Sequence, residues 1–295
     1  MTETDADLPG VEAAVAAAIR QGNNDSLRLL GHGEISLVLA WPTDQPQMAL
    51  KRVPPFRDAA SARQYVTVCD EFFDRLAAAG VPVWPTTLHV LERSDGRAVV
   101  YHRQPIANAA QLGTNVLHAT TPEAGHPLLV AVADAAPKVC TPTIGFDSQM
   151  SNWLWDGSTA THIDFTSPFV LTETRDELTY DSFAFLQEYP VALRPYLKRE
   201  LTKLVQRFTS VEGTLGDMVA NLMKEGLDAW VDPAIATINE RLGLSLTRAD
   251  AQQMYDDDRK LLPVVLKLKK VQRWWLTHTG RRYESLLPAT TTYGK

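Results

Sequence analysis

The segment 144–164 constrains the fold more strongly than any other part of the chain. It places Asp147 five residues before Asn152, and a short apolar run follows. The pair Asp156-Gly157 is then a favourable two-residue turn, and a second apolar run leads to Asp164. Such a hairpin brings an amide oxygen and a carboxylate together, which are ligands that suit Mg²⁺. We therefore expect a magnesium site here, with Asp147 at the mouth of the loop and free to accept a proton.

A plainer interpretation of the same residues is a strand hairpin with an aspartate that caps a nearby turn. An aspartate five residues before an asparagine is a common spacing, so this pattern alone does not separate the two interpretations. The order of the other motifs along the chain has to decide between them.

Composition and charge exclude several classes of protein. The chain has 295 residues and a net charge of −6, which argues against a generic nucleic-acid binder. It has no apolar run of about 18 residues, so we expect no membrane span. The polar N-terminus does not resemble a signal peptide. Cys69 and Cys140 lack metal-site spacing and are interpreted as buried thiols, which favours a cytoplasmic protein.

Alternating and helical patterns predict a small lobe in the first third of the chain. A short Ala-rich helix over 9–21 precedes it and ends at Gly22. We expect one antiparallel sheet with a helix packed beside it. The predicted strands lie near 27–31, 35–41, 47–53, 86–92 and 97–103, and the predicted helix covers 58–79.

Glycines and a lysine in this lobe are candidates for phosphate binding. Gly31 and Gly33 fall in the turn between the first two strands, where backbone N–H groups could approach phosphates without obstruction by Cβ. Lys51 lies within the third strand. The alternatives are an ordinary hairpin turn and a charge on an edge strand.

The segment 102–106 follows the fifth strand and is interpreted as a hinge. Its backbone, at Arg103 and Gln104 in particular, could hydrogen-bond an adenine ring. After Asp164 the chain has few strand signals. We expect helices at roughly 176–188, 193–208, 215–225, 232–242 and 247–279, and Pro263 is a candidate break in the last of them.

The last of these helices carries a run of basic and aromatic residues, 267–275, followed by Arg281 and Arg282. It is interpreted either as the solvated face of an amphipathic helix or as a site for an anionic partner or part of a phosphorylated substrate. A protein partner that binds through this helix is an open alternative.

The order of these motifs resembles the protein-kinase-like superfamily, in which D-x-x-x-x-N is followed by D-F-G. Here the third motif reads Asp164-Phe165-Thr166, and Gly145-Phe146 stands where the family has His-Arg or His-Gly. The A-P-E segment of protein kinases does not follow Asp164. The layout is therefore most similar to the aminoglycoside and choline phosphotransferase branch.

This resemblance implies a two-lobed α+β fold. Residues 1–25 would form a helical extension, residues 26–104 a small nucleotide-binding lobe with the five-stranded antiparallel sheet, and residues 105–295 a mainly helical lobe. It also implies that an acid on the helix 58–79 orients Lys51 toward the phosphates. Glu71 is the preferred candidate because of its spacing, and Asp70 and Asp74 compete with it.

The activity implied is transfer of the γ-phosphoryl group of ATP, with Mg²⁺, to a hydroxyl of a small molecule. Asp147 would be the catalytic base, Asn152 and Asp164 the metal ligands, and Lys51 the phosphate partner. The main alternative is a pseudokinase that binds nucleotide or a protein partner without turnover. A protein kinase and a nonenzymatic helical binding protein are further alternatives.

Overall fold

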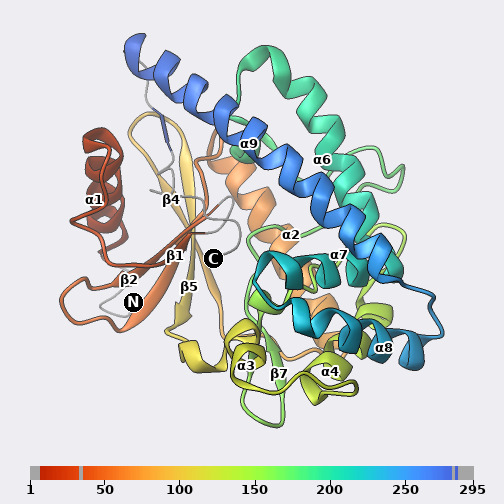
Figure 1. Ribbon diagram of the computed structural model, residues 1–295. Helices are drawn as coiled ribbons and strands as arrows, with labels where there is room; N and C mark the ends of the chain where they lie inside the picture. The colour runs from red at the N-terminus through yellow and green to blue at the C-terminus, as the bar shows by residue number, and fades with distance from the viewer. Residues whose placement is uncertain (1–6, 33–35, 281–282, 285–295) are drawn as a thin grey trace.

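The computed structural model describes residues 7–32, 36–280 and 283–284, and it shows a sheet-containing small lobe beside a mostly helical part (Figure 1). The small lobe is built on one antiparallel sheet with the strand order β1-β2-β3-β5-β4. The prediction of a single five-stranded antiparallel sheet is therefore confirmed. The strands are β1 (Leu29–His32), β2 (Leu37–Trp41), β3 (Met48–Arg52), β4 (Thr87–Glu92) and β5 (Ala98–Pro105).

Strand β3 sends alternate side chains to the two faces of the sheet. Leu50 faces α1 (Leu8–Gln21) and packs against Val11 and Val15 in one apolar cluster. Lys51 faces the opposite side, and its cross-strand partner on β5 is His102. The α1 helix thus covers the face of the sheet that turns away from Lys51.

Helix α2 (Ala59–Ala78) covers the face that carries Lys51. It begins at Asp58, whose side chain accepts a hydrogen bond from the backbone N–H of Ser61 at 2.8 Å. Tyr65 on its buried side donates to the carbonyl oxygen of Thr166 at 3.0 Å and contacts His102 Nε2 at 2.8 Å. The helix is therefore tied both to the sheet and to the segment that follows Asp164.

A buried ion network holds both ends of the described chain against the sheet. Glu12 of α1 accepts two hydrogen bonds of 2.8 Å from Arg52. Arg52 also donates to the carbonyl oxygen of Glu284 at 3.1 Å, and Arg93 lies 2.8 Å from the Glu284 carboxylate. Burial raises the pKa of Glu12, but Arg52 lowers it by more, so the carboxyl stays ionised.

The rest of the chain is mostly helical. Leu128 and Val132 of α4 pack against Leu215 and Met218 of α7 in the largest apolar cluster. Within the described residues, no helix combines the length and the apolar character needed to cross a membrane. The elements are α3 (Gly113–Ala119), α4 (Pro127–Val139), β6 (Trp153–Trp155), β7 (Ala160–His162), α5 (Phe183–Leu186), α6 (Arg194–Phe208), α7 (Val211–Lys224), α8 (Val231–Leu242) and α9 (Arg248–His278).

Two helix predictions differ from the structure. The helix expected over 176–188 is only the short α5, because the preceding residues form turns and isolated bridges. The break expected at Pro263 does not occur, since α9 continues through it and runs across the outside of the molecule (Figure 1). Apart from these differences, the α+β architecture agrees with the fold expected of a kinase-like protein.

Candidate functional site

Hydrogen bonds to α7 and to the end of α6 hold the loop that carries Asp147. The Thr214 hydroxyl donates to the carbonyl oxygen of Phe146, and the Ser148 hydroxyl donates to the carbonyl oxygen of Thr214 at 3.0 Å. The backbone N–H of Phe146 donates to the carbonyl oxygen of Phe208 at 3.0 Å. These bonds fix the loop backbone on both sides of Asp147. Sequence analysis missed Thr214, because 68 residues separate it from Phe146 in the loop.

Gly145 has a packing reason to be glycine. A Cβ atom there would lie 2.9 Å from the Cβ of Phe169 and 3.1 Å from the carbonyl carbon of Phe208. The Gly145 N–H also donates to the carbonyl oxygen of Phe169 at 2.7 Å. The close approach of these two segments therefore requires a glycine at this position.

His162, at the end of β7, supports the same loop from the other side. Its Nε2 donates to the carbonyl oxygen of Asp147 at 3.0 Å. The ring is fully buried and lies against the rings of Phe146, Trp153 and Phe165. Burial lowers the pKa of His162 to about 4, so the imidazole is neutral at pH 7. Sequence analysis missed this residue, although a histidine in an apolar strand next to Asp164 was visible.

Lys51 and Asp164 form the central ion pair of the site. The Lys51 Nζ lies 3.1 Å from Oδ1 of Asp164. The same oxygen accepts from the backbone N–H and the hydroxyl of Thr166, at 3.0 and 2.8 Å. Burial raises the pKa of Asp164, but Lys51 and Thr166 lower it by more, so that it lies well below the usual range. Asp164 is therefore an anion at every physiological pH.

Asp147 has the opposite electrostatic character. Burial, and after it the charge of Asp217, raise the pKa of Asp147 to about 7. The backbone N–H of Gln149, 3.2 Å from Oδ1, and the Asn152 side chain partly offset this rise. A carboxyl with a pKa near 7 can both accept and release a proton at neutral pH.

Asp217 of α7 is a second buried acid that sequence analysis missed. Its carboxylate accepts from Arg207 at 2.7 Å, from Asn221 at 2.9 Å and from the Gln149 side chain at 3.1 Å. Burial raises its pKa to about 6, although Arg207 lowers it. Because Gln149 contacts both Asp147 and Asp217, the two acids are linked through one residue.

The expected pairing of Glu71 with Lys51 is wrong. Glu71 is exposed on α2, and Lys51 contacts Asp164 instead. The reason is helical geometry, since Cys69 faces the carbonyl oxygen of Phe165 at 3.9 Å and Glu71 lies about 200° further around the helix. Asp70 and Asp74, the competing candidates, form no described ion pair with Lys51 either. Spacing along the sequence placed an acid on the right helix but not on the right face.

The hinge prediction for 102–106 also needs correction. Residues 102–105 belong to β5, and their backbone pairs with β3. The Gln104 side chain is buried beside Lys51 and donates to Thr86 Oγ1 and to the carbonyl oxygen of Ile163, both at 2.9 Å. Gln104 therefore connects the sheet directly to the strand end that carries Asp164, and a hinge can begin only after Pro105.

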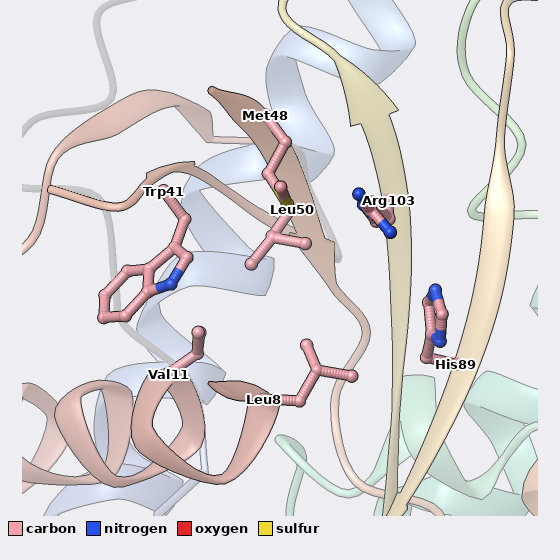
Figure 2. Close-up of a pocket in the computed structure, with 7 residues that line it drawn as sticks. All are labelled: Leu8, Val11, Trp41, Met48, Leu50, His89 and Arg103. Atoms are coloured by element: carbon pink, nitrogen blue, oxygen red, sulfur yellow. The ribbon is translucent and has the colours of Figure 1, made fainter. Parts of the chain in front are cut away.

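Arg103 lies on the wrong face of the sheet for the role expected of it. Figure 2 shows it beside His89, in a small hollow between the sheet and α1 that Leu8 and Trp41 also line. Since neighbouring residues of a strand point to opposite faces, Arg103 and Lys51 cannot contact the same ligand directly.

Of the two predicted glycines, only Gly31 can be placed. It belongs to β1 and pairs with Val38, and beyond its chain neighbours no heavy atom of the described residues lies within 4 Å of a Cβ built on it. Gly33 lies outside the described residues.

Comparison with known proteins identifies the family of the chain and finds solved structures that match it. The model of the family DUF6206, described as a family of unknown function, matches residues 10–273. No curated protein matches the chain. The solved structure "WaaP in complex with acyl carrier protein" is 13% identical to it, with a TM-score of 0.38, and the match covers 87% of this chain and 92% of that chain.

Proposed function

The chain belongs to the DUF6206 family, and we propose that it is a phosphotransferase. In this proposal it transfers the γ-phosphoryl group of ATP to a hydroxyl group of a small molecule. The observation that carries the proposal is the convergence of four residues from distant parts of the chain. Lys51 contacts Asp164, and the backbone N–H of Ile163 donates to the carbonyl oxygen of Asn152 at 2.9 Å. Besides burial and Asp217, the charge of Asp164 raises the pKa of Asp147, and the Asn152 side chain lowers it.

The two carboxyl groups have protonation properties that suit different roles. Asp147, with a pKa of about 7, takes the proton from the acceptor hydroxyl. Asp164 stays ionised and keeps the ammonium group of Lys51 at a fixed place. Lys51 then offers a positive charge to phosphate oxygens, and phosphoryl transfer depends mainly on such positioning and charge neutralisation.

The oxygen atoms of this site fit a magnesium ion. Among the residues described, no cluster of three or more His, Cys, Asp or Glu side chains forms a dedicated metal cage. Mg²⁺ does not need one, because it is usually held by one or two carboxylates, with water and substrate phosphates as the other ligands. Asn152 and the ionised Asp164 would hold it, and the ion would supply charge neutralisation at the phosphates.

A second candidate function is nucleotide binding without turnover. It is favoured by Gln104, whose side chain bonds the sheet to the Ile163 carbonyl beside Lys51. In this state Lys51 is engaged by Asp164 rather than by an acid on α2. Without an acid on α2 to orient Lys51, such a site could bind a nucleotide or a partner without turnover.

The experiment that tests these functions measures binding and turnover separately. Binding of Mg·ATP is followed by calorimetry and by thermal shift, because a ligand that binds the folded state raises its melting temperature. Turnover is followed as ADP formation with pooled hydroxyl compounds, including aminoglycosides and choline. The variants are Lys51→Met, Asp147→Asn and Asp164→Asn. Glu71→Gln is the matched control, since Glu71 is exposed on α2.

We expect Lys51→Met and Asp164→Asn to weaken Mg·ATP binding as well as turnover. Asp147→Asn should keep nucleotide binding and lose about 10²–10⁴ in rate. Glu71→Gln should behave as the wild type. Binding without turnover in the wild type would favour the second function, and no binding at millimolar Mg·ATP would reject both.

A further inference from the structure

The last four turns of α9 form a basic segment within an acidic protein. Residues 263–278 contain Lys267, Lys269, Lys270 and Arg273 but no aspartate or glutamate, whereas the whole chain has a net charge of −6. The segment runs along the outside of the molecule and reaches its edge (Figure 1). The segment is therefore locally positive, although the protein as a whole is negatively charged.

One side of this segment fixes it to the protein. Gln272 is buried, and Lys269 forms an ion pair of 2.7 Å with the buried Glu188. The guanidinium of Arg273 lies 5.7 Å from the centre of the Tyr283 ring. The orientation of the helix about its own axis is thereby set, and so is the face that it turns to solvent.

That outer face combines apolar and basic side chains on about one third of the helix circumference. Val264, Val271 and Trp274 are 53%, 50% and 60% exposed, although each is apolar. They are spaced by seven and three residues, which places them on one side of a helix. Lys267 and Lys270 are exposed along the same side. We call these five residues the α9 stripe.

We infer that the α9 stripe lies on the surface of an anionic lipid membrane. Tryptophan and aliphatic side chains flanked by lysines are the composition of helices that rest in the interfacial plane of a bilayer. Each lysine near an anionic leaflet adds electrostatic attraction. The positive charge of the stripe, with no acid among its neighbours along the helix, supplies the charge complementarity.

A membrane suits the stripe better than an acidic protein does, for a geometric reason. The stripe follows the crest of a single straight helix, which a flat surface can touch along its whole length. A protein partner that grips a helix usually offers a groove for an apolar face, with anchors repeated every three or four residues. Here two lysines interrupt the apolar positions, so they would have to enter such a groove.

Helix α6 provides an internal comparison. It also exposes an aromatic residue, Tyr196, at 62%. Its lysines are neutralised, because Lys198 pairs with Glu177 and Lys203 with Glu200, both at 2.8 Å. Exposure of an aromatic side chain is thus shared by both helices, whereas no acid among the described residues forms an ion pair with Lys267 or Lys270 of the α9 stripe.

The test is vesicle flotation with the full chain and without any substrate, so its outcome does not depend on the proposed phosphotransfer. Vesicles of phosphatidylcholine alone are compared with vesicles that contain about one third phosphatidylglycerol, at ~0.1 M and ~0.5 M NaCl. The variants are Lys267→Gln with Lys270→Gln, and Trp274→Ala. Tyr196→Ala is the matched control. Thermal unfolding of each variant checks that its fold is unchanged.

We expect the wild type to float with the anionic vesicles at low salt and to dissociate at high salt. The double lysine variant should bind roughly fivefold more weakly for each lysine removed, or about 25-fold in all. Trp274→Ala should also weaken binding to the anionic vesicles, and this weakening should remain at low salt, where the electrostatic attraction is strongest. Tyr196→Ala should bind as the wild type does.

Two results would overturn the inference. Wild-type protein that stays in the unbound fraction with both kinds of vesicle would point to an acidic protein as the partner. Vesicle binding that survives unchanged in the lysine and tryptophan variants would place the contact elsewhere on the molecule.

Discussion

Replacing Asp147 by asparagine should make the protein more stable at alkaline pH while it removes the proposed catalytic base. The wild-type carboxyl has a pKa of about 7 in the folded protein, because burial and Asp217 disfavour its charged form. In the unfolded chain the pKa returns to its ordinary value of about 3.9. Asparagine has the shape of the carboxyl and can keep the bond from the Gln149 N–H, but it carries no charge at any pH.

The magnitude follows from the linkage between protonation and folding. Between the two pKa values, the folded state holds a proton that the unfolded state has lost, so stability falls as the pH rises. A difference of about 3 pKa units corresponds to about 4 kcal/mol. The gain from Asp147→Asn should therefore be absent below about pH 4, grow through neutral pH and level off above about pH 8 at no more than this value.

Urea unfolding between pH 4 and pH 9, in buffers with a chelator, measures this difference directly. Asp156→Asn is an informative control, because the Asp156 carboxylate accepts bonds from Ser158 and Thr159 in the exposed hairpin turn. These bonds lower the pKa of Asp156, so its ionised carboxylate makes a stabilising contribution to folding, opposite in sign to that of Asp147. It is present at neutral pH and is lost as the pH falls through the folded-state pKa.

A stability difference between Asp147→Asn and the wild type that does not vary with pH would refute this reasoning. So would a variant that is less stable than the wild type at pH 8.5. Either result would mean that the carboxyl of Asp147 is better solvated than its surroundings indicate.

Two further substitutions test packing and charge pairing. Gly145→Ala should lower the free energy of unfolding by about 1–3 kcal/mol, since Phe169 and the Phe208 backbone must move. Thermal unfolding measures this loss, with Gly31→Ala as the control that should be tolerated. Equal melting temperatures for the two variants would contradict the packing argument. Glu12→Gln should lower the free energy of unfolding by about 3–5 kcal/mol at pH 7, because the buried guanidinium of Arg52 loses its nearer carboxylate and keeps only that of Glu284, at 3.8 Å. Urea unfolding measures this loss, and a cost below about 1 kcal/mol would show that water reaches Arg52.

The sheet and the hairpin were predictable because their signals are local. Apolar residues around Lys51 indicate strand β3, and the Asp156-Gly157 turn predicts the hairpin from only a few residues. The order of these elements then predicted which strands share a sheet. Short-range patterns of this kind are available to sequence analysis without knowledge of the tertiary structure.

The support of the site was not predictable in the same way. Thr214 and Asp217 look like ordinary polar residues of an amphipathic helix, and only the fold brings them to the loop of Asp147. Glu71 failed for a related reason, since a spacing of twenty residues says nothing about which face of α2 meets the sheet. Which residue faces Lys51 depends on the rotation of the helix, and tertiary packing sets that rotation.

The buried ion network on the sheet has a consequence for the order in which the protein is made. Arg52 and Arg93 are synthesised well before Glu284, yet Glu284 is one of the two acids that they share. Until residues 283–284 have been synthesised, these guanidinium groups have Glu12 as their shared partner from α1. The sheet can therefore complete this charge pairing only after residue 284 has been made, which couples its final folding to a segment that lies 232 residues after Arg52 in the chain.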